Sequence, residues 1–303
     1  MFSFTKEQKV LELGSINFGG QPGLHPTVLF GGLFFKEKLD FEIAGTEIQK
    51  MLDISKKLAV PAIPDLFIKK EQDIDSILSF IDTILPHNHP FSVDITDPDV
   101  KVQVLKRLDE NGFLQRVIYN SIHVGITEEE QNALLTHTPA MAIIVAFNPK
   151  DKSPDGKIEV LENGAHLIEQ GLLDLAKSCG IDKLLIDTAA LAPGDMSGAA
   201  IAALPVVKEE FGLPSGCAIH NVVEKSSWLH EFKDAKQVVD QASNINVSVF
   251  GGDFLLYGPI EHASTVFPII AWQDILVSEY AEGYFGVSPS AFHPRRRFYN
   301  DSG

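Results

Sequence analysis

RVIYNSI (116–122), AMAIIVAFN (140–148) and LLIDTAAL (184–191) are apolar runs of strand length, and an Asp or Asn ends or interrupts each. Their starts and those of the other such runs fall roughly 25 to 40 residues apart, which is the period of a strand–helix unit. Eight such units predict an α/β fold, a single (β/α)8 TIM barrel. The five other runs are PTVLFGGLFF (26–35), AVPAIPDLFI (59–68), FSVDIT (91–96), CAIHN (217–221) and NVSVFGGDFLLYG (246–258).

Helical patterns fill the gaps between these runs, with apolar residues at i, i+3 and i+4 spacing. The unbroken apolar character of most strands is typical of a parallel sheet that is buried on both faces. Before the first strand, residues 1–25 contain the turn cluster GGQPG (19–23) and predict a short N-terminal β-hairpin that closes the bottom of the barrel. We expect one domain over residues 1–303, with helices over 45–59, 72–85, 97–112, 127–135, 163–180, 197–212 (late or kinked at Pro205), 229–243 and 268–286.

The composition limits the class of partner. A formal net charge of −16 argues against nucleic acid and anionic membrane surfaces. Cys179 and Cys217 are too few for a disulfide framework and suit a reducing compartment. No apolar run is long enough to span a bilayer, so we expect a cytoplasmic protein without membrane insertion.

The strand ends carry the candidate site. In a TIM barrel the C-terminal strand ends form the active-site face. A carboxylate there can accept two parallel hydrogen bonds from an N–H/NH2 edge, and an amide can read mixed donor–acceptor edges, so the set favours binding of a flat polar heterocycle. The candidates are Asp65, Asp94, Asn120, Asn148, Asp187 and Asn221.

Each candidate also has a structural interpretation. Asp187 and Asp94 are suited to cap helices, Asn148 stands before a proline as turn residues do, and Asp65 fits a loop. Gly251 and Gly252 interrupt the eighth run, where they would permit close approach of a ring or a partner backbone. His220, beside Asn221, is interpreted as a packed structural histidine. The other histidines lack metal-ligand spacing, so no metal site is predicted.

GGQPG and TVLFGGLFF together resemble the GGQPGE-PTVLIGSIFY signature of the MtrH family, which comprises a subunit of tetrahydromethanopterin S-methyltransferase and its soluble bacterial relatives. The resemblance covers nearly the whole chain. It implies that Asp94, Asn120 and Asp187 hold a pterin ring, with Asn148 as a second-line candidate. It also implies that Asn221 faces N5, the nitrogen that exchanges the methyl group, so that Asn221 and Asp187 serve the reaction directly.

The resemblance further implies a methyltransferase that moves a methyl group from a methylated corrinoid (cobalamin) to N5 of tetrahydrofolate. This chain has no cobalamin-binding DxHxxG motif, so a separate corrinoid-binding protein would carry that cofactor. Leu24-His25 replaces the acidic residue of the signature and GGLFF replaces GSIFY. These departures favour the bacterial type, which works in anaerobic demethylation of quaternary amines such as glycine betaine. A homodimer is expected from the same resemblance.

Other functions stay open at this point. One is that of the methanogen MtrH subunit itself, with tetrahydromethanopterin as the pterin, and another is a non-catalytic docking subunit of a membrane methyltransferase complex. A barrel lyase or aldolase would need a Schiff-base lysine, for which Lys69 is placed just past the second strand. A synthase that joins a pterin to a phosphorylated substrate would need a phosphate site near the last two strands, where Lys225 is the nearby cation.

Overall fold

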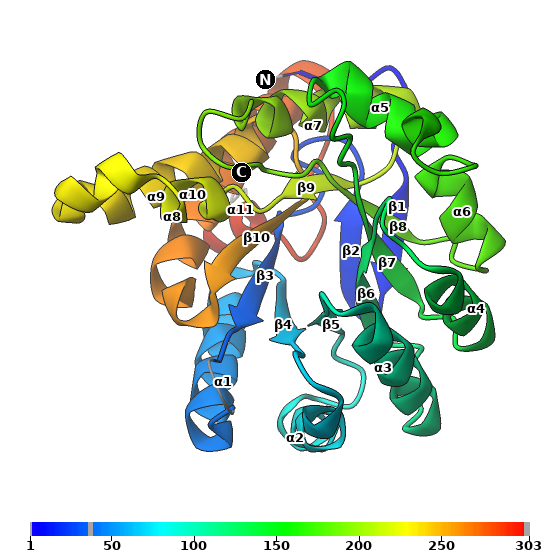
Figure 1. The fold of residues 1–303 in the computed structure, drawn as a ribbon. Coiled ribbons are helices and arrows are strands. Elements are labelled where there is room, and N and C mark those ends of the chain that lie inside the picture. Colours follow the sequence, from blue (N-terminus) through cyan, green and yellow to red (C-terminus); the bar gives the residue numbers. More distant parts are fainter. Residues whose placement is uncertain (1, 36–38, 300–303) are drawn as a thin grey trace.

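A computed structural model describes residues 2–35 and 39–299 and shows a closed parallel barrel (Figure 1). The strand order round the barrel is β10-β3-β4-β5-β6-β7-β8-β9, and β1 and β2 form a separate antiparallel pair. The predicted TIM barrel and N-terminal hairpin are therefore confirmed. The strands are β1 (Val10–Leu13), β2 (Ile16–Gly19), β3 (Val28–Leu33), β4 (Ala62–Phe67), β5 (Phe91–Asp94), β6 (Val117–Ile122), β7 (Met141–Val145), β8 (Leu184–Asp187), β9 (Ser215–Cys217) and β10 (Phe254–Pro259).

Helices surround the strands in a ring (Figure 1). Many of them begin at the residues that favour helix starts, such as Asp97 before Pro98, whose side chain accepts hydrogen bonds from the first turn. The helices are α1 (Phe41–Leu58), α2 (Ile74–Ile84), α3 (Pro98–Glu110), α4 (Glu128–Thr136), α5 (Pro154–Asn163), α6 (Leu172–Ser178), α7 (Gly198–Phe211), α8 (His220–Glu224), α9 (Lys233–Val249), α10 (Ala263–Phe285) and α11 (Pro294–Phe298), with short 3-10 turns η1 (Glu71–Asp73), η2 (Gly164–His166), η3 (Ser227–Glu231) and η4 (Ile260–His262).

Two predicted elements are wrong in a way that matters for the site. The seventh strand ends at Cys217, so His220 and Asn221 lie in the following short helix. The eighth strand begins at Phe254, because the residues up to Val249 complete α9. The buried residues Asn244, Val247 and Ser248 are spaced as one face of a helix, and that periodicity overrides the strand-like composition of the run.

The predicted helix over 163–180 is also wrong. A helix ends at Asn163, where Gly164 takes a left-handed conformation with φ 76°, and a second helix starts only at Leu172. The earlier helix, α5, begins with Ser153 as its cap and Pro154 in the first turn. Pro205 lies inside α7, which starts at Gly198, so the late start is wrong as well.

The hairpin closes the N-terminal end of the barrel, as predicted. Leu13, Ile16 and Phe18 are buried in one apolar cluster with barrel residues such as Phe30 and Phe254. Lys208 of α7 adds a polar anchor, since its buried Nζ donates to the carbonyl of Gly20 at 2.9 Å. The barrel interior is therefore covered at this end, and the C-terminal end is left for a site.

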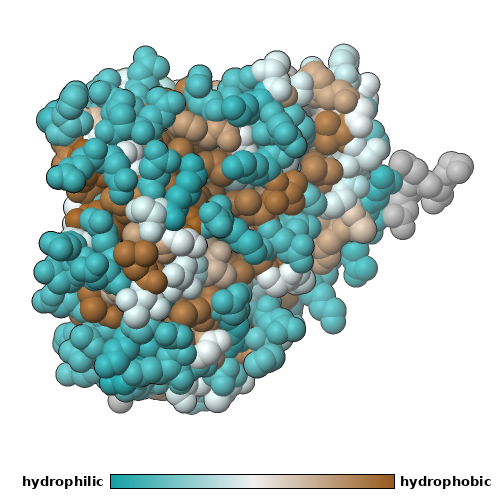
Figure 2. Space-filling view, turned by 90° about the vertical axis from the view of Figure 1, so that its right-hand side faces the viewer, coloured by the Kyte–Doolittle hydropathy of each residue, from teal (hydrophilic) through white to brown (hydrophobic). Residues whose placement is uncertain are grey.

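The surface beside α3, α4 and α6 is mostly hydrophilic, with small apolar patches between polar side chains (Figure 2). Among residues 2–35 and 39–299, no helix is long and apolar enough to cross a membrane.

A buried ion pair supports the barrel from outside. Lys101 of α3 and Glu130 of α4 are each 1% exposed, and their Nζ and Oε1 atoms lie 3.0 Å apart. Lys101 also donates to the carbonyl of Ser121 at 2.8 Å, and the Tyr119 hydroxyl donates to Glu130 at 2.8 Å. The pair thus fixes the end of β6, which carries Asn120.

Lys101→Met is expected to lower the free energy of unfolding by about 3–5 kcal/mol, because it leaves the Glu130 carboxylate buried without its cation. Urea denaturation measures the loss. Lys106→Met is the matched control on the same helix: its side chain is 56% exposed and its Nζ lies 4.0 Å from Glu110 Oε1, so the change should stay below about 1 kcal/mol. Equal effects of the two substitutions would contradict the role of the buried pair.

Candidate functional site

A polar layer lies directly above the apolar interior of the barrel. Ile63, Ile118 and Leu185 belong to the interior cluster. Side chains alternate along a strand, so the residues two positions later point to the same side. Those residues are Asp65 of β4, Asn120 of β6 and Asp187 of β8, which therefore face the C-terminal mouth of the barrel.

The strand register adds a third carboxylate. Asp94 of β5 is paired with Asn120, and Ser92, two residues earlier, is paired with Asp65. Asp94 thus shares the inward side with Asn120. We call Asp65, Asp94, Asn120 and Asp187 the mouth layer; they are four of the six strand-end candidates, and the structure brings them together.

The three carboxylates of the mouth layer resist ionisation. Burial raises the pKa of Asp65 and that of Asp187 to about 6. Burial raises the pKa of Asp94 to about 8, and the charges of Asp65 and Asp187 act in the same direction. Like charges in a low-dielectric site repel, so near neutral pH the layer holds fewer than three negative charges. Asp94 is the carboxyl that keeps its proton, and it can then donate a hydrogen bond.

Several polar atoms of this layer have bonding capacity to spare. Asn120 Nδ2 donates to Asp65 Oδ2 across a long 3.5 Å. Asp65 Oδ1 and Ser92 Oγ are buried and make no hydrogen bond of normal geometry to the described residues, although the Ser92 hydroxyl is near enough to Asp65 to lower the pKa of that carboxyl. Asp187 Oδ1 accepts from the backbone N–H of Ala189 at 2.8 Å. Buried polar atoms are nearly always paired, so this layer is suited to a ligand that supplies the missing donors.

Two neighbours of this layer were not predicted from the sequence. Lys157 of α5 is buried, its Nζ lies 3.4 Å from the carbonyl oxygen of Ala189, and its charge lowers the pKa of Asp187 against the effect of burial. The Ser153-Pro154 helix start was the signal that could have placed it. Phe34, just past β3, is exposed and packs edge-on against Phe67, with ring centroids 5.9 Å apart, which places aromatic rings beside the mouth.

Asn148 does not join the mouth layer. Its Oδ1 accepts from the backbone N–H groups of Lys150 and Asp151, and its Nδ2 donates to the carbonyl of Gly156. These bonds hold the amide inside its own loop, as in a turn, and a pterin contact by Asn148 stays a prediction. Asn221 is exposed on α8 and lies beyond the end of β9, so it sits at the rim rather than on a strand tip.

Gly251 and Gly252 are misplaced in the prediction. They precede β10, so they lie at the N-terminal end of the barrel, away from the mouth. The carboxylate of the next residue, Asp253, accepts a hydrogen bond from Lys208 at 2.5 Å, near the hairpin. The missing side chain of Gly252 lets its backbone pack closely against α9, because a Cβ on Gly252 would lie 2.6 Å from a Val247 methyl carbon.

The profile of a protein family described as the tetrahydromethanopterin S-methyltransferase MtrH subunit matches residues 6–289. The chain belongs to this family. The corresponding subunit of tetrahydromethanopterin S-methyltransferase from Methanothermobacter thermautotrophicus is 37% identical over 308 residues, which cover 97% of this chain and 98% of that protein. The corresponding subunit of a putative mtx methyltransferase from Methanosarcina barkeri is 34% identical over 308 residues, with the same coverage.

Solved structures of dihydropteroate synthases share the fold. The enzyme from Coxiella burnetii, in complex with pteroic acid, superposes with a TM-score of 0.59 at 15% identity and covers 82% of this chain and 94% of its own. The enzyme from Xanthomonas albilineans, in complex with 7,8-dihydropteroate, gives 0.57 at 17% identity and covers 88% and 98%. Membership of the MtrH family confirms the predicted resemblance and makes this chain a methyltransferase subunit by family.

Asp94→Asn is expected to stabilise the protein at pH 8 and not at pH 4. A carboxyl whose pKa is raised on folding binds more protons in the folded state, so its contribution to stability is present below the unfolded pKa and is lost as pH rises through about 8. Removing that charge should raise the free energy of unfolding at pH 8 by about 1–3 kcal/mol, measured by urea denaturation at both pH values. Asp99→Asn, at an exposed carboxyl on α3, is the control; a pH-independent gain in Asp94→Asn would refute the explanation.

Proposed function

We propose that this chain binds a reduced pterin in the barrel mouth and transfers a methyl group between N5 of that pterin and a corrinoid held by a partner protein. The observation that carries the proposal is the mouth layer: three inward carboxyls and one amide, with unpartnered buried oxygens, on strands that end together. Methyl transfer is proposed as the reaction because the chain belongs to a family of methyltransferase subunits.

The mouth layer is complementary to the edge of a 2-amino-4-oxopyrimidine. The ionised carboxylate of Asp187 would accept two parallel hydrogen bonds from the ring N–H and the amino group. Asp94, protonated near neutral pH, would donate a hydrogen bond to a ring acceptor. The Asn120 amide can either donate a hydrogen bond through its NH2 group or accept one through its oxygen. A site with both donors and acceptors discriminates this heterocycle from one that lacks the matching pattern.

Asn221 stays in the proposal as the residue that faces N5, carried over from the family resemblance. Its place on α8 after β9 is on the rim of the mouth, and its side chain is exposed. A neutral amide can accept from a protonated amine or donate to the free one, so it follows N5 through the reaction without a charge of its own. The corrinoid would supply or accept the methyl group when its carrier protein docks at this rim.

Tetrahydromethanopterin is the better supported pterin, because the relatives named for an activity are subunits of tetrahydromethanopterin S-methyltransferase. Tetrahydrofolate, with glycine betaine demethylation as its setting, was favoured by departures from the family signature. Leu24-His25 lies between β2 and β3 at the closed end of the barrel, so this departure is poorly placed to select a pterin at the mouth. Gly32 of GGLFF is the exception, since it is paired with Asp65 at the mouth.

The homodimer and the cytoplasmic location remain predictions.

Asp187→Asn is expected to weaken pterin binding by about 10–100-fold, the loss of a charge-assisted hydrogen-bond pair. Titration calorimetry with tetrahydrofolate and with tetrahydromethanopterin, without oxygen, measures the affinity and names the pterin. Asp182→Asn, at an exposed carboxyl just before β8, is the matched control and should bind as the unaltered protein does. If neither pterin binds the unaltered chain, the proposal fails.

Asn221→Ala is expected to slow methyl transfer by about 10–100-fold while pterin affinity stays within about 3-fold, because the amide acts on N5 and not on the pyrimidine edge. Loss of the methyl–cobalt absorbance of methylcobalamin in the presence of pterin follows the reaction. A purely structural role of Asn221 would instead lower affinity and rate together.

A further inference from the structure

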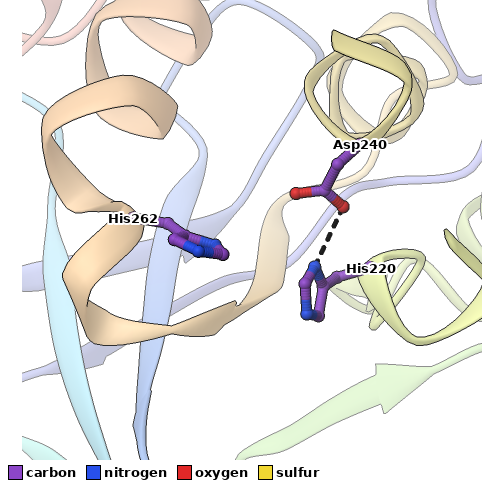
Figure 3. Close-up of side chains that lie close together, drawn as sticks. All are labelled: His220, Asp240 and His262. Atoms are coloured by element: carbon purple, nitrogen blue, oxygen red, sulfur yellow. Dashed lines mark hydrogen bonds and ion pairs between the residues drawn. The ribbon is translucent and has the colours of Figure 1, made fainter. Parts of the chain in front are cut away.

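His220, Asp240 and His262 form a cluster of potential metal ligands at the rim of the barrel (Figure 3). They come from three elements, namely the start of α8 after β9, the middle of α9, and η4 after β10. One ring nitrogen of each histidine and one carboxylate oxygen all lie within 4.8 Å of one another. The side chains converge on a common space between these elements (Figure 3).

The spacing within the cluster is close to that of a coordination sphere. His220 Nδ1 and Asp240 Oδ1 are 2.9 Å apart. Ligand atoms at about 2.0–2.2 Å from one ion are separated by about 2.8–3.1 Å in octahedral geometry and by about 3.3–3.6 Å in tetrahedral geometry. An ion can therefore replace the proton that these two atoms share with little movement. A His262 nitrogen lies within 4.8 Å of both ligand atoms, so a shift of up to about 1–2 Å would bring it into the same coordination sphere.

The surroundings hold the ligands in place. His220 is 6% exposed and Asp240 is 5% exposed. The His220 ring packs against the backbone of β10, where a Cβ on Gly258 would lie 2.3 Å from its Cδ2. Gly258 has a φ of 88°, so both its conformation and its missing side chain make room for this ring.

His262 provides the second, independent observation. Its Nδ1 is buried and has no hydrogen-bond partner among the described residues. The two imidazoles are arranged edge to face with ring centroids 5.9 Å apart, rather than hydrogen-bonded to each other. A buried ring nitrogen without a partner costs free energy, and metal coordination would satisfy it.

We propose that His220, Asp240 and His262 bind one divalent transition-metal ion of the zinc class. Two imidazoles and one carboxylate suit zinc and leave a position for water, whereas calcium and magnesium prefer oxygen ligands. The ion joins the segments after β9 and β10 to α9, and so fixes the start of α8. Asn221 is the next residue after His220, so the metal positions the amide at the rim without contacting the pterin layer.

The test uses the full chain, stripped of metal with a chelator and then titrated with Zn²⁺. Calorimetry should show one site per chain, and Co²⁺ should give the visible absorption bands of a low-coordinate nitrogen–oxygen site. His262→Ala and Asp240→Asn should weaken Zn²⁺ binding by more than about 100-fold, since loss of even an outer-shell partner of a metal ligand costs up to that factor. His230→Ala and Asp234→Asn, at exposed residues of η3 and α9, are the matched controls.

Thermal unfolding separates metal binding from folding. The melting temperature of the unaltered chain should rise with Zn²⁺, and that of folded His262→Ala should not. Pterin affinity should be the same with and without metal, so failure of the metal site is distinguishable from failure of the proposed function. Absence of stoichiometric Zn²⁺ binding, or binding that all the variants retain, would overturn the proposal and leave His220–Asp240 as a hydrogen-bonded pair.

Discussion

The closure of the barrel forces three carboxyl groups into one low-dielectric mouth, and the rest of the site depends on that constraint. Asp65, Asp94 and Asp187 stand on different strands, but parallel strands in a closed barrel end at the same rim. Burial, reinforced by the charges of Asp65 and Asp187, raises the pKa of Asp94 to about 8 and so keeps it protonated near neutral pH. The buried cations Lys101 and Lys157 stand behind this layer and offset part of its charge.

This arrangement opposes stability, since buried carboxyls with raised pKa values cost free energy whenever they must ionise. The apolar interior and the hairpin that covers the opposite end compensate, because Phe18 and Phe30 are almost fully buried in the cluster below the layer. A site that is destabilising in isolation and persists only because the surrounding structure holds it is typical of a functional site.

The barrel and the mouth layer could be predicted from the sequence because unbroken apolar runs are typical of buried parallel strands, and an Asp or Asn that ends or interrupts such a run is visible without coordinates. Asp65, Asp94, Asn120 and Asp187 all follow that pattern. Asn221 and Gly251 do not, because the runs that contain them pass into helix or turn, and residue type alone does not show where a strand stops. The His220–Asp240–His262 cluster was invisible for a different reason: its members come from separate elements, so only the folded chain brings them together.

The mouth is asymmetric, and the asymmetry separates the two reactants of the proposed transfer. The carboxyls belong to β4, β5 and β8, whereas the inward positions on β9 and β10 are Gly216 and Leu256, which carry no charge. A ring bound by the acidic strands would leave its other side toward β9 and β10.

The segments that follow these two uncharged strands carry Asn221 and the histidine cluster. The chemistry at N5 and the approach of a bulky carrier would therefore both fall on the side of the mouth formed by β9 and β10, whose own inward strand positions carry no carboxyl. Alignment of two reactants across such a mouth would accelerate the displacement, and it can supply about 7–11 kcal/mol in favourable cases.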